Sequence, residues 1–436
     1  MIVTNRLKTN RSWKIVNQIF HDVSIRRLSG NSRETTPTSA SEFAEIKKPL
    51  LELLINTYAA DGRLPHASNT SPSSVPAYCN IPPHIAKRVG TQLHLRKNHP
   101  LNIIKSKIER YWLHDNEQSN ASSSFRIFDD FHPLVRTHDN FDSLLIPKDH
   151  VSRSKSDTYY LDEETVLRTH TSAHQLELLQ VSREEDITNH SFLVSGDVFR
   201  RDEIDSSHYP IFHQMEGVRL FDRGTSSSTV EHDLMDGLEG MAKVLFGNVE
   251  MRWVDAYFPF TSPSLELEIY FEGEWLEVLG CGVIEKNIIR AAGRIDQPGW
   301  AFGLGLERLA MVLFGIPDIR LFWTNDQRFH EQFSDGEIVK FKPYSKYPPC
   351  LKDISFWTNN SFHANDLNEV IRDIAGDLVE RVELIDEFKH PKTNRNSNCF
   401  RITYRSMDRS LTNHEIDVLQ EKVRERVVKS FGLELR

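Results

Sequence analysis

Residues 196–217 combine apolar, strand-like segments with more charged side chains than a packed core can hold. A hydrophobic run at 192–194 leads into FRRDE at 199–203, and a polar turn then returns through 209–212 to HQMEG at 213–217. Two apolar segments around a polar turn predict a long antiparallel hairpin. Because buried unpaired charge is costly, a polar ligand on one face is the economical explanation of these side chains.

The side chains of this hairpin favour two kinds of ligand group. Arg200 and Arg201 form a guanidinium fork suited to phosphate, whereas Gln214 and Glu216 suit an ammonium or amide group. Alternate residues of a strand point to the same face, so both groups of side chains can lie on one side. A structural hairpin held by internal ion pairs is the alternative, and the hairpin alone does not decide between them.

Length and composition exclude several classes of protein. The chain has 436 residues, of which 39% are hydrophobic, so it can bury a large core and form two folded units. Because no apolar stretch approaches the roughly 18 residues of a spanning helix, no membrane association is expected. The four cysteines lie far apart without a CxxC pair, which argues against a disulfide scaffold and a zinc site, and no protein metal site is expected.

The first 33 residues are basic, although the formal net charge of the whole chain is −9. They hold seven Lys or Arg against one Asp and lack a long apolar segment, which is typical of an organellar transit peptide. A disordered basic tail that binds RNA is the alternative. Residues 34–80 are expected to form a flexible extension rich in Ser, Thr and Pro, followed by a catalytic domain at 81–345.

The middle of the chain mixes strand and helix patterns. Alternating or apolar runs predict strands at 192–194, 249–257, 265–271 and 275–278. Helical spacing predicts helices ending near residue 114 and at 172–181, 230–246 and 306–314. These patterns predict an α+β fold with a mainly antiparallel sheet flanked by helices.

Residues 346–436 form a second domain after Pro348 and Pro349. The patterns predict strand, helix, strand, strand, helix and strand at 353–357, 365–377, 379–388, 398–406, 413–431 and 433–436. This βαββαβ order is that of a ferredoxin-like module. Thr412 or Asn413 is expected to cap the last helix.

Four further stretches of the middle domain carry unusual residues. They are RTHTSAHQ at 168–175, AYFPFTSPS at 256–264, EVLGCGVIE at 277–285, interpreted as a strand broken by two glycines, and GWAFGLGLERL at 299–309. The last lacks the third glycine of a dinucleotide fingerprint, so its glycines are expected to let backbone pass close to a ligand. Arg308 adds a positive charge that could bracket a polyphosphate together with Arg200.

FRRDE at 199–203 and GLGLER at 303–308 resemble motifs two and three of class II aminoacyl-tRNA synthetases. With THTSAHQ at 169–175, YFPFTSPS at 257–264 and the ferredoxin-like tail, they resemble the single-chain mitochondrial phenylalanyl-tRNA synthetases over most of the chain. The resemblance implies a class II catalytic sheet and a ferredoxin-like anticodon-binding domain. It also implies ATP and Mg²⁺ as cofactors, phenylalanine and tRNA(Phe) as partners, and a monomer in the mitochondrial matrix.

In this family, phenylalanine is joined to ATP as phenylalanyl-adenylate and then transferred to the terminal adenosine of tRNA(Phe). The resemblance assigns the α-phosphate to Arg200 and the γ-phosphate to Arg308, with His208 assisting as the third catalytic residue. Glu203, with magnesium, would help to place the nucleotide. Such chemistry depends on alignment and electrostatics rather than on a covalent nucleophile.

The resemblance also implies a phenylalanine site. Gln214 and Glu216 would bind the ammonium group, Phe258 and Phe260 would pack edge-to-face on the ring, and Ala301 would form the pocket floor. For the two phenylalanines, ordinary core packing is the alternative. The complete implied set is His170, Ser172, Ala173, His174, Gln175, Ser207, Tyr209, Gln214, Met215, Glu216, Phe258, Phe260 and Ala301.

Residues 346–436 have no net charge, so RNA affinity must come from local faces. The candidates are Lys389, Lys392, Arg395, Arg401 and Arg405, although a solvated sheet face would also explain the arginines on strand 398–406. Two other functions are a catalytically inactive synthetase-like RNA-binding protein and an adenylate-forming ligase without a tRNA substrate. The intact motif residues count against the first, and the ferredoxin-like tail counts against the second.

Overall fold

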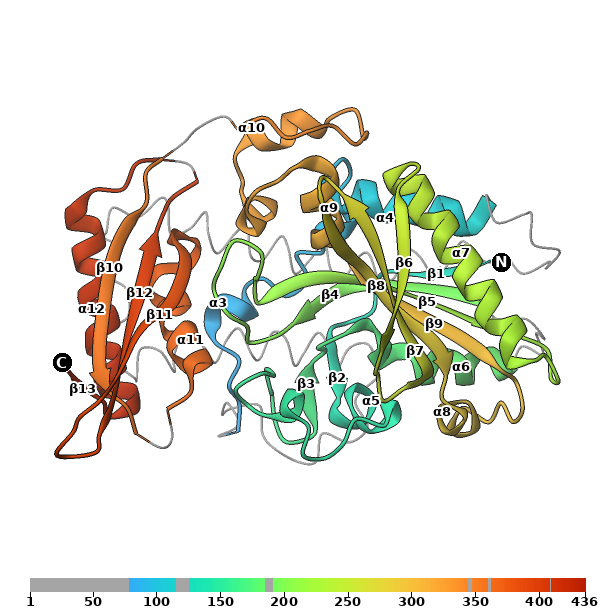
Figure 1. The fold of residues 1–436 in the computed structure, drawn as a ribbon, viewed down its shortest axis with the longest axis horizontal. Helices are drawn as coiled ribbons and strands as arrows, with labels where there is room; N and C mark the ends of the chain where they lie inside the picture. Colours follow the sequence, from blue (N-terminus) through green and yellow to red (C-terminus); the bar gives the residue numbers. More distant parts are fainter. Residues whose placement is uncertain (1–77, 115–124, 185–190, 344–346, 360–361, 408) are drawn as a thin grey trace, which may run out of the picture. The chain divides into compact units, whose positions relative to one another are not determined.

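The computed structural model describes residues 78–114, 125–184, 191–343, 347–359, 362–407 and 409–436 (Figure 1). The chain divides into two compact units, Met1–Thr91 and Gln92–Arg436. The described part of the first unit contains the short helix α3 (Pro83–Ala86). The predicted transit peptide, and all but the last three residues of the predicted extension, lie outside the described residues.

A seven-stranded sheet organises the first part of the second unit (Figure 1). Strand β1 runs parallel to β4, and every other neighbouring pair is antiparallel, which confirms the predicted α+β fold. In spatial order the strands are β1 (Arg126–Phe128), β4 (Ser191–Phe199), β5 (Ile211–Leu220), β9 (Gly299–Gly305), β8 (Glu274–Ile284), β7 (Thr261–Phe271) and β6 (Glu250–Ala256).

The predicted hairpin is formed by β4 and β5, paired from Ser191 opposite Arg219 to Phe199 opposite Ile211. The expectation of a strand broken by two glycines was wrong, because β8 runs without interruption through Gly280 and Gly282. Hydrogen bonding to a strand on each side keeps this backbone extended. The glycine-rich β9 was not predicted as a strand, because glycine is depleted in strands.

Helices cover both faces of the sheet. The first core contains residues of α4 (Pro100–His114), α7 (Ser227–Phe246) and α9 (Leu306–Phe314). The second core contains residues of α6 (Gln175–Glu184) and α8 (Lys286–Ala291). Along β9, Trp300 and Phe302 belong to the first core and Ala301 to the second, so alternation assigns each strand residue to a face.

Smaller elements complete this part of the chain. A two-stranded sheet pairs β2 (Leu134–Arg136) with β3 (Thr165–Leu167), and the short helices α5 (Thr137–Asn140) and α10 (Gln327–His330) lie in connections. The predicted helix at 172–181 begins with the 3₁₀ turn η5 (Thr171–His174), which leads into α6. None of the described helices is long and apolar enough to cross a bilayer.

The C-terminal part has the predicted ferredoxin-like order and a four-stranded antiparallel sheet with strand order β11-β12-β10-β13. Thr412 caps the last helix: its hydroxyl accepts the N–H of Glu415, and the Glu415 carboxylate accepts the N–H of Thr412. In chain order the elements are β10 (Cys350–Trp357), α11 (Ala364–Ala375), β11 (Val379–Lys389), β12 (Asn396–Tyr404), α12 (Asn413–Phe431) and β13 (Glu434–Leu435).

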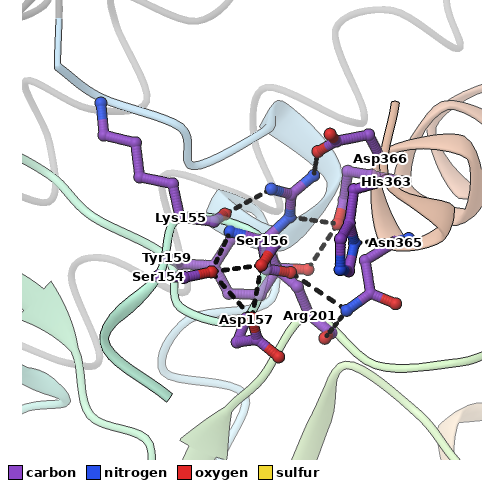
Figure 2. Close-up of polar contacts among 10 residues, drawn as sticks. Ser154, Lys155, Ser156, Asp157, Tyr159, Arg201, His363, Asn365 and Asp366 are labelled. Carbon is purple, nitrogen blue, oxygen red and sulfur yellow. Dashed lines mark hydrogen bonds and ion pairs between the residues drawn. The ribbon is translucent and has the colours of Figure 1, made fainter. Parts of the chain in front are cut away.

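Helix α11 contacts the loop that follows β4 (Figure 2). Arg201 donates to Asp366 at 2.9 Å, and Asn365 donates to the carbonyl oxygens of Arg201 and Ser156. Arg372 of α11 donates to the carbonyl oxygens of Asp202 and Glu203. These hydrogen bonds hold the backbone of the FRRDE segment against the ferredoxin-like part.

Candidate active site

The second face of the central sheet carries a floor of residues with little or no side chain. Gly280 pairs with Gly303 and Gly282 with Ala301, and Gly305 continues the row along β9. A Cβ atom added at Gly303 or Gly305 would meet no atom within 4 Å. The open space over Gly303 and Gly305 lets a flat ligand lie close to the backbone there, as the glycines of GLGLER predicted, whereas Gly280 is covered by Phe258 and Gly282 by Pro263.

Glu216 provides a carboxylate on this floor and lies opposite Gly303, the middle residue of the β9 row. It is 3% exposed, and its Oε2 atom is buried without a hydrogen-bond partner, as is Oε1 of Gln175. Burial raises the pKa of Glu216 to about 7, although interactions with the Ser172 and Thr171 side chains lower it in part. Unsatisfied buried acceptors are rare, and these two fit a ligand that brings N–H donors.

The buried side chain of Arg168 supports the turn η5, which leads into Gln175. Arg168 packs against Gly196 and donates to the carbonyl and carboxylate oxygens of Asp197 at 2.7 and 2.9 Å. It also contacts Nε2 of His174 at 2.9 Å, and the His174 ring stacks on Phe131 at 4.4 Å. His174, which the sequence assigned to phenylalanine, is therefore engaged in the support of η5.

The turn η5 lies beside Glu216, because the side chains of Ser172 and Thr171 interact with that carboxylate. Ala173 is buried in the same turn. Both ring nitrogens of His170 are buried. Burial and the nearby Arg200 guanidinium lower the pKa of His170 to about 3, so this ring is neutral at physiological pH. A neutral ring can accept or donate one hydrogen bond to a ligand.

Two aromatic rings border the floor on the β7 side. Phe258 and Phe260 stack at a centroid distance of 5.8 Å, and the Phe258 ring occupies the space where Gly280 lacks a Cβ atom. Phe260 packs against the second core, which contains Ala301. Met215, by contrast, lies in the first core on the opposite face, so the structure does not bring its side chain to this group.

Arg200 and Arg308 lie at one edge of the floor. Strands β4 and β9 are both antiparallel to β5, so they end at the same edge, and these arginines follow their ends. Nε of Arg200 donates to the carbonyl oxygen of Thr169 at 2.9 Å, and its guanidinium lies 5.1 Å from the Phe212 ring centroid. Arg308 forms an exposed ion pair with Glu277 at 3.2 Å. The arrangement suits an elongated polyanion.

Arg201 does not share a ligand with Arg200. Its side chain donates to the Lys155 carbonyl oxygen and pairs with Asp366 (Figure 2). It also pairs with Glu369 at 3.5 Å. The expected guanidinium fork was therefore wrong, because consecutive side chains of an extended segment point in opposite directions.

The loop between β4 and β5 carries the remaining predicted residues. Burial lowers the pKa of His208, but its hydrogen bond to Asp205 at 2.7 Å outweighs this effect and raises the pKa overall. Ser207 donates to the same carboxylate at 2.8 Å. The Tyr209 hydroxyl donates to Asp377 at 2.7 Å, and its ring stacks on Trp323. These contacts of Ser207 and Tyr209 are therefore made with residues other than Glu216, the carboxylate predicted to bind the ammonium group.

Two acidic residues near Arg308, Glu266 and Glu277, are not among the residues predicted for the site. Burial and the carboxylates of Glu277 and Glu268 raise the pKa of Glu266, while Arg308 lowers it. The sequence does contain a signal for Glu266, because Glu266 and Glu268 alternate with apolar residues along the segment at 265–271. Among the described residues, no three His, Cys, Asp or Glu side chains form a cluster arranged to hold a metal ion.

The predicted RNA-binding residues fall into two sets. Arg401 binds Asp353 through two hydrogen bonds of 2.9 and 2.8 Å, and Arg405 pairs with Glu380 at 3.0 Å. Each of these guanidinium groups has a carboxylate partner on a neighbouring strand, and their role in RNA binding stays a prediction.

The second set lies where β11 and β12 are joined. Lys389 and Lys392 are exposed, and the Arg395 guanidinium lies 4.7 Å from the Trp357 ring centroid. The Trp357 ring is 5.9 Å from His390. Cations beside partly exposed rings are the combination that binds unpaired bases.

Most of the chain is similar to known proteins. A model of tRNA synthetases class II core domain (F) matches residues 89–333, and a model of the ferredoxin-fold anticodon binding domain matches residues 345–436. The chain is 56% identical over 365 residues to phenylalanine–tRNA ligase, chloroplastic/mitochondrial, of Arabidopsis thaliana, with 82% of each protein covered.

Two mitochondrial relatives agree. The chain is 47% identical over 394 residues to phenylalanine–tRNA ligase, mitochondrial, of Mus musculus, covering 82% of the chain and 86% of the relative. It is 46% identical over 417 residues to the enzyme of the same name from Dictyostelium discoideum, covering 83% and 90%. The chain therefore belongs to the class II aminoacyl-tRNA synthetases, in the family of the organellar phenylalanine–tRNA ligases.

Proposed function

We propose that this chain is a phenylalanine–tRNA ligase that forms phenylalanyl-adenylate from phenylalanine and ATP and then transfers the amino acid to tRNA(Phe). The observation that carries the proposal is the order of polar groups along the floor. The unsatisfied buried carboxylate of Glu216 lies opposite Gly303, and two arginines follow the edge of the floor beyond Gly305. An amino acid joined to a nucleotide has this same order of charges.

At the amino-acid end, Glu216, Gln214 and Gln175 bind the ammonium group of phenylalanine. The first two are alternate residues of β5 and therefore share a face. Phe258 and Phe260 pack against the aromatic ring, and Ala301 lies beneath it. Each aromatic contact contributes about 0.5–1.5 kcal/mol beyond burial.

At the nucleotide end, the phenylalanine carboxylate attacks the α-phosphorus of ATP, and pyrophosphate leaves. Arg200 stabilises the negative charge that develops on the α-phosphate, Arg308 binds the γ-phosphate, and His208 and Glu203 assist from the loop. Preorganised charges of this kind accelerate transfer without a covalent nucleophile. Engagement of the γ-phosphate by Arg308 also requires it to leave Glu277.

The residues near Arg308 fit the magnesium ion that accompanies ATP. Mg²⁺ prefers carboxylate and phosphate oxygens, and burial together with the neighbouring carboxylates of Glu277 and Glu268 raises the pKa of Glu266, a cost that a bound divalent cation would relieve. Glu266 and the Glu277 carboxylate released by Arg308 would hold the ion, which supplies charge neutralisation at the phosphates.

The ferredoxin-like part binds the anticodon region of tRNA(Phe). Lys389, Lys392 and Arg395 provide the cations, and Trp357 provides an aromatic surface beside them. The enzyme acts as a monomer in the mitochondrial matrix. The names of the relatives support an organellar location, and the presence of both domains in one chain supports the monomer.

The decisive experiment is phenylalanine-dependent exchange of labelled pyrophosphate into ATP, followed by aminoacylation of mitochondrial tRNA(Phe). Both activities are expected in the wild-type protein, and Arg200→Ala should abolish exchange without changing the thermal midpoint. Binding of tRNA without any exchange would instead indicate an inactive RNA-binding relative. Exchange without tRNA charging would indicate an adenylate-forming ligase.

A further inference from the structure

Strand β9 ends before it reaches the position opposite His213 of β5, so it cannot accept the backbone N–H of that residue. Gly305 is the last residue of β9 and pairs with Gln214, after which the chain turns into α9 at Leu306. His213, which precedes Gln214 in β5, therefore has no partner in β9, although it pairs with Asp197 of β4 on its other side. The carboxylate of Glu307 takes this place, because its Oε2 atom accepts the backbone N–H of His213 at 2.8 Å.

A second hydrogen bond closes the pair. Nδ1 of His213 contacts Oε1 of Glu307 at 2.7 Å, so both carboxylate oxygens are held by one residue. His213 is 0% exposed and Glu307 is 3% exposed. Two charge-assisted bonds in a buried position fix the carboxylate much more firmly than a single exposed contact would.

The pair lies between the groups that bind the nucleotide. Glu307 immediately precedes Arg308 in the first turn of α9. His213 follows Phe212, whose ring packs against Arg200, and precedes Gln214. Rotation or displacement of the first turn of α9 would therefore redirect Arg308, and the bonds to His213 oppose such a movement.

We propose that His213 is a positioning residue that acts through Glu307 to hold Arg308 at the γ-phosphate. The proposal rests on the proposed function, since it assumes that Arg308 binds ATP. His213 itself does not touch the substrates, because it lies on the opposite face of β5 from Gln214 and Glu216. The competing explanation is that the pair only stabilises the fold.

Three variants separate these explanations. His213→Leu removes the side-chain donor at similar volume, whereas His213→Asn keeps a donor near the position of Nδ1. Asp233→Asn is the matched control: Asp233 links α7 to the far ends of β5 and β9 by accepting from Arg219 at 3.1 Å and Trp300 at 2.7 Å. Thermal midpoints and pyrophosphate exchange are measured for each variant.

His213→Leu should lower kcat/KM for ATP by about a hundredfold, the typical cost of a small misplacement, while phenylalanine affinity without ATP stays near the wild-type value. His213→Asn should recover most of this loss. Asp233→Asn should lower the thermal midpoint without changing kcat/KM for ATP. If Asp233→Asn impairs ATP use as much as His213→Leu does at equal loss of stability, the pair is structural only.

A double-mutant comparison tests the route through Arg308. ATP affinity is measured by equilibrium dialysis in the wild type, His213→Leu, Arg308→Ala and the combined variant. If His213 acts through Arg308, the substitution His213→Leu should weaken ATP binding when it is made in the wild-type protein. It should have no further effect when it is made in the Arg308→Ala variant. If the loss of ATP affinity in the combined variant equals the product of the losses in the two single variants, the two residues act independently and the proposal is wrong. Absence of phenylalanine-dependent exchange in the wild type would instead reject the proposed function.

Discussion

Glu216 lies directly opposite Gly303 on the neighbouring strands β5 and β9. A buried carboxylate thus faces a position without a side chain, and a Cβ atom added there would meet no atom within 4 Å. A carboxylate beside open space can pair with a ligand cation that fills the space. The first two predictions use this relationship.

Phenylalanine affinity should rise with pH between about 6 and 8. Burial raises the pKa of Glu216 to about 7, and only its carboxylate form attracts the ammonium group. Dissociation constants measured without ATP should therefore fall as Glu216 ionises. Glu216→Gln should remove this pH dependence and weaken binding roughly 10- to 150-fold, the equivalent of about 1.5–3 kcal/mol. Unchanged pH dependence in Glu216→Gln would show that another group titrates.

The stability of the ligand-free protein should respond to pH in the opposite direction. Because the folded-state pKa of Glu216 lies above its ordinary value of 4.5, its contribution is present below that value and is lost as the pH rises through about 7. Thermal midpoints should accordingly fall over this range in the wild type and less in Glu216→Gln. Added phenylalanine should restore part of the loss.

Gly303→Ala should weaken substrate binding without destabilising the protein. The methyl group would enter the space over the floor, where crowding of a ligand costs about 1–3 kcal/mol. Gly217→Ala is the matched control on the adjacent strand, because its Cβ atom would overlap the Phe302 ring in the core. Gly217→Ala should lower the thermal midpoint, and Gly303→Ala should raise KM at an unchanged midpoint. Wild-type KM in Gly303→Ala would place the ligand elsewhere.

Ala301→Gly should extend the amino-acid pocket. Ala301 is buried in the second core beside Phe260, so loss of its methyl group deepens the space under a bound ring. Exchange supported by para-chlorophenylalanine should increase relative to phenylalanine. If the ratio of kcat/KM for the two amino acids does not change, Ala301 is not the floor of the pocket.

Lys392→Ala and Arg395→Ala should weaken tRNA(Phe) binding, whereas Arg401→Ala should not. Arg395 lies beside the Trp357 ring and reaches Glu434 through one hydrogen bond of 2.8 Å, and the Lys392 backbone N–H donates to His390, whereas the Arg401 guanidinium is bound by both carboxylate oxygens of Asp353. Binding measured over a range of salt concentrations should show a slope reduced by about 0.7 for each RNA phosphate that the variant no longer neutralises. An effect of Arg401→Ala equal to that of Arg395→Ala would assign the RNA to the sheet face instead.

Local sequence determined much of this protein. Helical spacing gave α9 and α12 with their observed bounds, and the turn between two apolar segments gave the β4–β5 hairpin. The family resemblance carried by FRRDE and GLGLER was confirmed by the comparisons. These features depend on residues close together in the chain, where spacing and polarity decide the conformation.

Only the tertiary structure decided what each polar side chain contacts. Arg200 and Arg201 are adjacent in sequence, yet one borders the floor and the other binds Asp366 of α11. Glu307 meets His213 across 94 positions of sequence because β9 stops opposite Gln214. Spacing fixes the direction of a side chain within its own element, but its partner depends on register and packing between distant segments.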